Sequence, residues 1–310
     1  MRRAPSRLRQ RGVAVVTALL LTTLAITIVA SLFWQQQVQI RSIENQRLQL
    51  QKQWILRGAL DWARVILRAD AATSNNDNLT EPWAVPLEET RLDQYVENGR
   101  DATEASDATL SGSTIDAQSR FNLTNLCSAG AVNPAEVKVF AQLLANLQLP
   151  PALAQATANL MSKAQKRLVE APNAPQPLDI RNVEDLLAVP GFTLEIFNKL
   201  KDHVVVLPKR TTVNINTASA EVLSARIATL TLSEANALVA GRKRAHFRSI
   251  NEIQTRLPGK QMTLDPNDIS IMTNYFIVNG NVRLNRAGLR VRALIERDGQ
   301  SARVLWIRED

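Results

Sequence analysis

The sequence predicts an α+β fold in which a long N-terminal helix packs on an antiparallel sheet, with a large all-α insert between the strands. Three observations favour this fold. An uncharged apolar run near the N-terminus continues into a polar stretch without proline. Strand-like patterns close the chain, and helical patterns fill most of the stretch before them. The 310 residues, 45% of them apolar and 21% charged, exclude wholesale disorder.

The first predicted element is a membrane-spanning helix over residues 13–34, which carry no charge. About 20 apolar residues suffice to cross a hydrocarbon core of about 30 Å. An ordinary signal peptide is the alternative, but it has a shorter apolar segment that ends in a small-residue cleavage site. The length of the run therefore favours an anchor.

The basic residues before this run predict its orientation. Five arginines and no acidic residue precede residue 12, namely Arg2, Arg3, Arg7, Arg9 and Arg11. The positive-inside rule places that end in the cytoplasm and the bulk of the chain on the far side. Of 37 basic residues, 32 remain without these five, against 29 acidic ones. The net charge of +8 is therefore weak evidence for a nucleic-acid ligand.

Residues 35–69 contain no proline, which predicts that the helix continues beyond the membrane. Apolar side chains recur there at spacings of 7, 4, 3 and 4 and share one helix face: Leu48, Ile55, Ala59, Trp62 and Ile66. An unrelated coiled coil is the alternative, but the stretch lacks sustained heptads. We expect this face to pack against the sheet.

The C-terminus predicts a β-hairpin with Asp298-Gly299 as its two-residue turn. That turn would pair Ile295 with Ala302, Ala293 with Val304, and Val291 with Trp306. Phe276 and Val278 predict a preceding strand that ends at an Asn279-Gly280 turn.

Another β unit is predicted over residues 113–126, as two short strands around a turn. Its expected buried side chains are Ile115, Phe121 and Leu123.

Residues 133–272 predict the helical insert, which opens with Asn133 as a cap and Pro134 in the first turn. A second helix follows, and a proline-rich linker covers residues 171–177. Two sets of short helices then resemble SAM-like or helix-hairpin-helix units, at residues 182–204 and 216–253.

The order of these segments resembles a known family. A short basic leader ending in Gly12, then an apolar helix that becomes amphipathic, resembles type IV pilin-like subunits. RGVAVVTALL, the glutamine-rich stretch from Gln35 and the later LDWARVIL resemble, more narrowly, general secretion pathway protein K. That family is the large minor pseudopilin of type II secretion. An Asp-x-x-x-Arg-Phe-Asn-Leu-Asn region of the family is matched by Asp116, Arg120, Phe121, Asn122 and Leu123.

The resemblance implies that prepilin peptidase cleaves between Gly12 and Val13 and that the new amine can be methylated. Most pilin-like subunits carry a glutamate at the fifth mature position, and its carboxylate can pair with the amine of a neighbouring subunit. Thr17 stands there in this chain. The protein K family shares this departure, which suits an end position in the fibre.

The resemblance also implies a domain organisation around a pilin-like fold. The segments are a cytoplasmic leader at 1–12, a transmembrane half-helix at 13–34, a periplasmic half-helix at 35–70, a pilin-like α/β domain at 71–127 and 273–310, and an inserted α-domain at 128–272 with SAM-like subdomains at about 128–207 and 208–272.

The implied function is that of a non-enzymatic assembly protein. It would cap the periplasmic pseudopilus with the minor pseudopilins resembling proteins I and J. Further partners implied by the family are the major pseudopilin, prepilin peptidase and the inner-membrane secretion platform. The implied location is the inner membrane, with a cytoplasmic N-terminus, and the pseudopilus tip after assembly.

A membrane-anchored DNA receptor is the alternative function, since residues 213–257 resemble helix-hairpin-helix DNA modules. In such modules, glycines in the hairpin let backbone N–H groups approach a phosphate. The equivalent turn at 227–232 contains no glycine. A basic cluster does follow it, comprising Arg242, Lys243, Arg244, His246 and Arg248. A cluster without a phosphate nest favours protein contact over DNA binding.

No catalytic, cofactor or metal residue is predicted. The nucleophile-elbow, phosphate-loop, dinucleotide and zinc-protease patterns are all absent from the sequence. The single cysteine, Cys127, is expected to be a small buried apolar residue. The family resemblance implies that calcium can be bound, with its ligands unassigned. The oxygen-rich stretch 264–268 does not match the twelve-residue calcium loop and is expected to be a plain turn.

Overall fold

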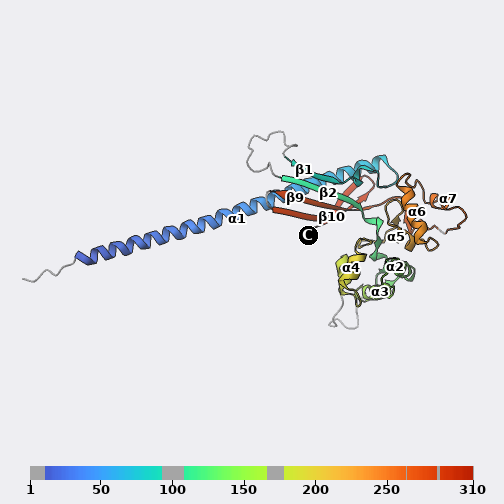
Figure 1. Cartoon of the computed structure of the whole chain (residues 1–310), viewed down its shortest axis with the longest axis horizontal. Helices are drawn as coiled ribbons and strands as arrows, with labels where there is room; N and C mark the ends of the chain where they lie inside the picture. The colour runs from blue at the N-terminus through green and yellow to red at the C-terminus, as the bar shows by residue number, and fades with distance from the viewer. Residues whose placement is uncertain (1–10, 93–107, 166–177, 263, 285–286, 310) are drawn as a thin grey trace, which may run out of the picture. The chain divides into compact units, whose positions relative to one another are not determined.

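The computed structural model describes residues 11–92, 108–165, 178–262, 264–284 and 287–309. The chain forms two compact units, Met1–Ile55 and Leu56–Asp310. Helix α1 (Arg11–Thr73) makes up the described part of the first unit and opens the second (Figure 1). The expected long N-terminal helix is therefore confirmed. Most of the predicted leader and the predicted linker at 171–177 lie outside the described residues.

The second unit contains a five-stranded antiparallel sheet with strand order β1-β2-β9-β10-β11 (Figure 1). The strands are β1 (Leu87–Arg91), β2 (Ala108–Asp116), β9 (Tyr275–Leu284), β10 (Ala287–Asp298) and β11 (Ser301–Glu309). β2 pairs with β9 along its whole length, although the insert separates them in the chain. The insert therefore leaves and rejoins the sheet at adjacent strands, and the α+β class is confirmed.

One face of the sheet packs against the end of α1. Its buried side chains include Phe276 and Ile295, which lie with Leu60 and Leu67 of the helix. Trp83, in the 3-10 turn Pro82–Ala84 after the helix, meets Phe276 edge to face, with ring centroids 5.2 Å apart. This arrangement is the one favoured for aromatic pairs.

The buried stripe of α1 differs from the predicted one. It comprises Leu56, Leu60, Ala63 and Leu67, whereas the predicted Trp62 is 64% exposed. Apolar residues occur at helical spacing on both of these faces, and a shift of one residue rotates the buried stripe by about 100°. Of the predicted stripe, Ile66 is half-buried and packs against the same core, so the prediction is correct in part.

The C-terminal hairpin forms, but its turn and register differ from the prediction. Gly299 and Gln300 make the turn, so Ala302 pairs with Arg297 rather than with Ile295, and the three predicted pairs are all wrong. Gly299 has a φ of +54°, as in hairpin turns with glycine in the first loop position. Near the turn the register moves by two residues, which is the strand period, so Ala302 and Val304 still lie with Ala293 and Ile295 on the face toward α1. An irregularity after Leu294 shifts the pairing by one more residue, and Trp306 lies on the opposite face.

Asn279 and Gly280 lie in the middle of β9 and not at a turn, so that prediction was also wrong. Gly280 instead allows close packing of the helix, since a Cβ there would lie 3.2 Å from Leu56 Cδ2. The paired Gly112 of β2 is more restricted, because its Cβ would lie 2.7 Å from the Asn279 carbonyl oxygen. Here glycine marks a close backbone approach inside a sheet.

The insert is built from short helices around a buried core. The helices are α2 (Pro134–Asn146), α3 (Ala152–Gln165), α4 (Leu194–Leu200), α5 (Ala220–Arg226), α6 (Leu232–Arg242) and α7 (Glu252–Arg256). Asn133 caps α2 as expected, accepting from the N–H groups of Ala135 and Glu136. Phe121 and Leu123 belong to this core and are buried, whereas Ile115 is half-buried.

Two-residue strand pairs tie the insert together. The parallel pairs are β3 (Phe121–Asn122) with β6 (Val204–Val205) and β7 (Val213–Asn214) with β8 (Ile269–Ser270); the antiparallel pair is β4 (Cys127–Ser128) with β5 (Ala131–Val132). The insert also packs on the sheet. Val205 and Leu207 are buried with Ile277 and Leu294, on the face opposite α1.

Candidate functional site

The predicted processing site lies at the beginning of α1. Gly12 and Val13 are both helical. The Thr17 hydroxyl donates to the carbonyl oxygens of Val13 and Ala14, each at 3.0 Å. Thr17 is therefore neutral and satisfied within its own helix. Cleavage between Gly12 and Val13 stays a prediction.

The apolar part of α1 is long enough to cross a membrane. Among the described residues, the helix Val13–Thr73 contains an 18-residue window with a mean hydropathy of 2.5, none of it buried. Its threonine hydroxyls at positions 22, 23 and 27 also donate to carbonyls of the same helix, which satisfies them without water. Length and composition thus fit an inner-membrane anchor.

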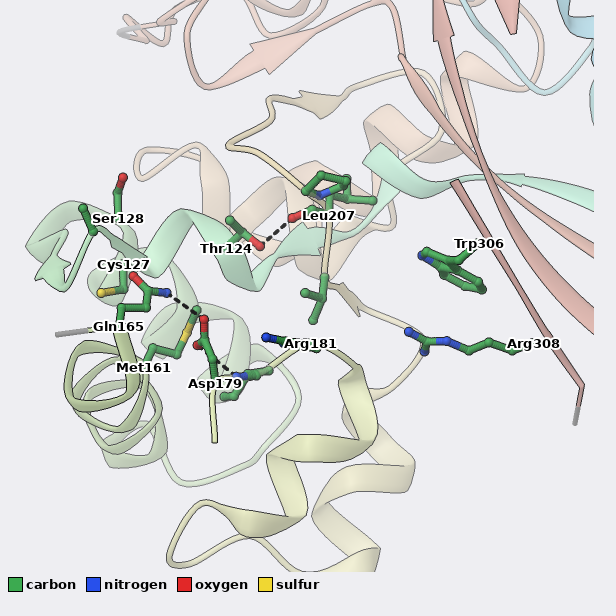
Figure 2. Close-up of a pocket in the computed structure, with 14 residues that line it drawn as sticks. Thr124, Cys127, Ser128, Met161, Gln165, Asp179, Arg181, Leu207, Trp306 and Arg308 are labelled. Atoms are coloured by element: carbon green, nitrogen blue, oxygen red, sulfur yellow. Dashed lines mark hydrogen bonds between the residues drawn. The ribbon is translucent and has the colours of Figure 1, made fainter. Parts of the chain in front are cut away.

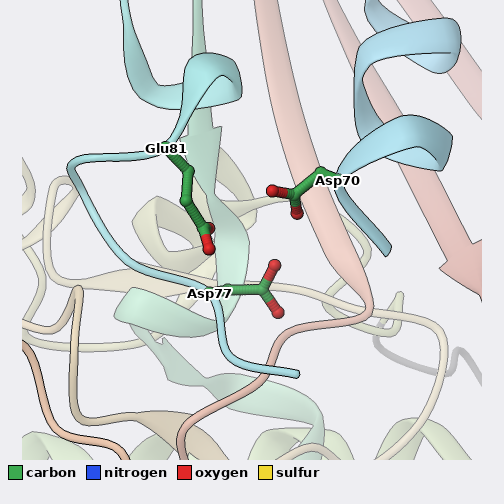
Figure 3. Close-up of side chains that lie close together, drawn as sticks. All are labelled: Asp70, Asp77 and Glu81. Atoms are coloured by element: carbon green, nitrogen blue, oxygen red, sulfur yellow. The ribbon is translucent and has the colours of Figure 1, made fainter. Parts of the chain in front are cut away.

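A buried cluster of charges joins the end of α1 to the sheet, and Figure 3 shows its carboxylates, those of Asp70, Asp77 and Glu81. Arg297 of β10 donates to Asp70 Oδ2 at 2.8 Å and to Asp77 Oδ1. It also donates to the Thr273 carbonyl at 3.0 Å, and its guanidinium lies 4.7 Å from the Phe276 ring centroid. The buried guanidinium of Arg297 therefore binds the end of α1, the loop after it and the residue Thr273 before β9.

Burial raises the pKa of the Asp70 carboxyl to about 6. The nearby charge of Glu81 raises it further, while the hydrogen bond from Arg297 opposes the shift. Asp70 thus depends on Arg297 for its charged form.

The same cluster was tested as a cation site, because the family resemblance implies calcium. Oxygens of Asp70, Asp77 and Glu81 lie within 4.8 Å of one another, with all three carboxylates turned toward a common space in Figure 3. Arg297, however, already supplies a cation to the two aspartates. Glu81 accepts from Ser74 at 2.8 Å and from the Trp83 indole at 2.7 Å. These oxygens therefore do not fit a divalent ion.

The stretch 264–268 was the other oxygen-rich candidate. Asp265 Oδ1 accepts from the Asn267 backbone at 2.8 Å, as in a local turn. Asp268 lies 3.0 Å from Arg210. These contacts resemble those of a plain turn and an ion pair.

Asp116, at the end of β2, is a buried hub between the sheet and the insert. Its Oδ2 accepts from Asn214 at 2.8 Å and from the Thr217 hydroxyl at 2.5 Å, and its Oδ1 accepts from the Gln118 N–H at 2.7 Å. Asn214 also donates to the Asp77 carbonyl at 3.0 Å. Burial raises the pKa of Asp116 to about 6.

The residues after Asp116 hold the segment that separates the two halves of the insert. Asn122 accepts from the Leu207 N–H at 3.1 Å and donates to the Lys209 carbonyl at 2.8 Å. Asn125 makes the same double contact with Thr211, at 3.1 and 3.0 Å. Sequence reasoning matched this region to the family but assigned it no role. The signal that the sequence offered was the pair of asparagines, Asn122 and Asn125, three residues apart in an apolar stretch.

The α5–α6 unit turns its key basic residues inward. Arg226 forms a bidentate pair with Glu136 of α2, at 2.9 and 2.8 Å. Arg242, from the predicted basic cluster, is buried and donates to the Ile215 carbonyl at 2.7 Å. The N-terminus of α6 is occupied by a Thr231–Glu234 capping box. Lys243, Arg244 and Arg248 of the predicted cluster are exposed, but the α6 N-terminus beside the hairpin turn is already capped and the turn has no glycine, so the DNA-receptor alternative is not favoured.

A cavity of about 500 Å³ lies between the insert and β11 (Figure 2). Cys127, Met161 and Asp179 line it on the side of the insert, and Trp306 and Arg308 line it on the side of the sheet. Cys127 is buried and is not in a disulfide, which agrees with its expected packing role.

Comparisons with known proteins identify the family. Two family models, both described as type II secretion system (T2SS), protein K, match residues 119–209 and 213–272. Proteins named type II secretion system protein K are similar over most of the chain. That of Pseudomonas aeruginosa is 28% identical, over 89% of this chain and 85% of its own length. That of Klebsiella pneumoniae is 26% identical, over 94% of both.

The fold is shared with a solved structure. A chain in the crystal structure of the GspK-GspI-GspJ complex from the enterotoxigenic Escherichia coli type 2 secretion system matches with a TM-score of 0.64 and 21% identity. The match covers 87% of this chain and 99% of that one. Family models, full-length relatives and fold agree with one another, and together they support the type II secretion system protein K family for this chain.

Proposed function

We propose that this pseudopilin caps the tip of the periplasmic pseudopilus and, together with other minor pseudopilins, initiates its assembly for the secretion of folded proteins. The observation that carries the proposal is Thr17, whose hydroxyl is bonded within its own helix. A pilin-like subunit docks onto a preceding one by pairing a buried carboxylate with its amine. This chain can offer an amine to the next subunit but has no such carboxylate for a preceding one.

The insert supports the same end position. It packs on the sheet face opposite α1 through Val205 and Leu207, and Asp116 holds it by buried hydrogen bonds from Asn214 and Thr217. The added bulk is therefore part of the folded body and not a flexible appendage. A regular fibre that stacks similar subunits has no room for such a body along its length.

The proposed partners are the minor pseudopilins resembling proteins I and J, which is supported by the fold match to a chain of the GspK-GspI-GspJ complex. The major pseudopilin, prepilin peptidase and the inner-membrane platform are proposed from the family. The proposed topology has residues 1–12 in the cytoplasm, where cleavage after Gly12 occurs at the membrane face. We propose no catalytic role for the chain.

The first test is the N-terminal mass of the chain purified from membranes, with and without prepilin peptidase. A peptidase-dependent start at Val13, methylated or not, is expected. The same unprocessed mass in both preparations would contradict processing.

The second test locates the chain in sheared pseudopili by gold labelling of an epitope placed at Leu178, which is 90% exposed. Gold particles at one end only are expected. Particles along the fibre would contradict capping while leaving the processing result unaffected.

A further inference from the structure

A second cavity, of about 370 Å³, lies between the sheet and the insert. Ile277 and Asn279 of β9 line it from the sheet face opposite α1, and Phe197 and Val204 line it from the insert. Its charge is unusual. Five basic side chains line it, namely Arg120, Arg181, Lys201, Arg292 and Arg308, against two carboxylates, those of Glu184 and Asp202.

Arg120 is a largely enclosed cation of this cavity. Its side chain is only 19% exposed, and its nearest carboxylate in the described part of the chain is Asp202 at 3.8 Å, beyond hydrogen-bond length. Asp202 itself is 72% exposed. Burial lowers the pKa of Arg120, and the nearby charge of Arg292 lowers it further, while Asp202 opposes both. A buried guanidinium is costly unless it is paired.

Arg292 lies 3.7 Å from the carboxylate of Glu184, whose side chain is 54% exposed. Arg120 therefore lies near the positive charge of Arg292, and its nearest negative charge, Asp202, is on the solvent-exposed side. An incoming carboxylate would reduce this repulsion and could accept hydrogen bonds from a guanidinium fork.

The cavity adjoins the cavity of about 500 Å³ described above. Arg181, Val206, Trp306 and Arg308 line both. Figure 2 shows Trp306 and Arg308 on β11 at one wall of the larger cavity, and the Arg308 guanidinium lies 4.3 Å from the Trp306 ring centroid. We name these two adjoining cavities the basic cleft. Its wall β11 is an edge strand of the sheet.

We propose that the basic cleft binds an acidic, extended segment of a partner protein, with one carboxylate at Arg120 and Arg292. Charge complementarity supports an acidic occupant. Two adjoining cavities, the apolar side chains of Met161 and Trp306 that line them and an edge strand at the wall fit a chain segment better than a single small anion. The proposal does not depend on tip placement.

The test measures fluorescence anisotropy of a fluorescein-labelled hexapeptide of alternating glutamate and valine with the full chain in neutral detergent. Binding is expected for this peptide and not for the lysine–valine counterpart. Arg120→Gln and Arg292→Gln are each expected to weaken binding about tenfold. Arg290→Gln is the matched control, because Arg290 is an exposed arginine of the same strand as Arg292 outside the cleft.

Thermal unfolding of the same proteins separates loss of binding from loss of fold. Arg120→Gln is expected to unfold at the wild-type temperature or above it, since it removes a poorly paired buried charge. Equal peptide affinity in all four proteins, or no binding to the wild type, would overturn the proposal. Displacement of the peptide by an equal concentration of inorganic phosphate would show a site for small anions and would also overturn it.

Discussion

Asn214 donates a hydrogen bond of 2.8 Å to the carboxylate of Asp116, 98 residues earlier in the chain. Both side chains are buried. The contact joins the end of β2 to the strand β7 of the insert, and the other amide proton of Asn214 reaches the Asp77 carbonyl beyond α1. A helix end, a sheet strand and the insert therefore share one hydrogen-bonded centre, which holds the insert in a fixed place on the pilin-like body.

Removing the Arg297 guanidinium is expected to destabilise the fold strongly. Arg297→Gln leaves Asp70 and Asp77 buried without their cation, and breaking such a pair typically costs about 3–5 kcal/mol. The free energy of unfolding, measured by urea denaturation of the full chain in detergent, should fall by that amount. Arg290→Gln, an exposed change nearby on β10, is the control.

A second substitution tests the cause of that loss. Asp70→Asn removes one of the unpaired charges, so Arg297→Gln combined with Asp70→Asn should be more stable than Arg297→Gln alone. A double variant no more stable than the single one would show that packing, and not charge, explains the effect.

Stability is expected to depend on the protonation of Asp116. Burial raises its folded-state pKa to about 6, above the usual value of 3.8. The folded state therefore binds the proton more tightly than the unfolded state, and this stabilisation is lost as the pH rises from about 4 to 6. Asp70, with a pKa also raised to about 6, acts in the same direction.

Melting temperatures of the wild type and Asp116→Asn across this pH range measure the effect. The amide cannot ionise, so the stability of the variant relative to the wild type should rise with pH. A constant offset between the two curves would mean that Asp116 does not titrate in this window.

Gly112→Ala is expected to disturb the pairing of β2 with β9. The added methyl group would lie 2.7 Å from the Asn279 carbonyl oxygen, a backbone atom that cannot rotate away. Overpacking of this kind typically destabilises by about 1–3 kcal/mol. The matched control is Gly288→Ala in β10, where nothing lies within 4 Å of the new methyl group. Equal melting temperatures for the two variants would contradict the close approach.

Asn122→Ala is expected to release the segment around residues 207–209. The change removes the acceptor for the Leu207 N–H and the donor for the Lys209 carbonyl, in a buried site. Each buried polar group left unsatisfied costs about 1–3 kcal/mol. Hydrogen exchange should show the Leu207 amide exchanging faster in the variant, with Asn198→Ala, at an exposed position of α4, as the control. Unchanged protection at Leu207 would rule out this role.

Local sequence patterns were sufficient to predict the elements that depend on neighbouring residues. The apolar run of α1, the Asn133–Pro134 start of α2 and the existence of a C-terminal hairpin all follow from neighbouring residues, and each was predicted correctly. The processing site at Gly12 and the position of Thr17 are likewise matters of sequence order and stay predictions about processing and assembly. A residue's chain neighbours decide whether it can start a helix or cross a membrane.

The tertiary structure decided the features that depend on contacts between residues far apart in the sequence. Gly280 resembles a turn glycine in sequence, yet it lies mid-strand because Leu56 of α1 packs against it. The hairpin register and the buried face of α1 were also decided by what packs on the opposite side. The pairing of Arg297 with Asp77, 220 residues apart, has no local signal, because a charge pair depends on distance in space and not on spacing in sequence.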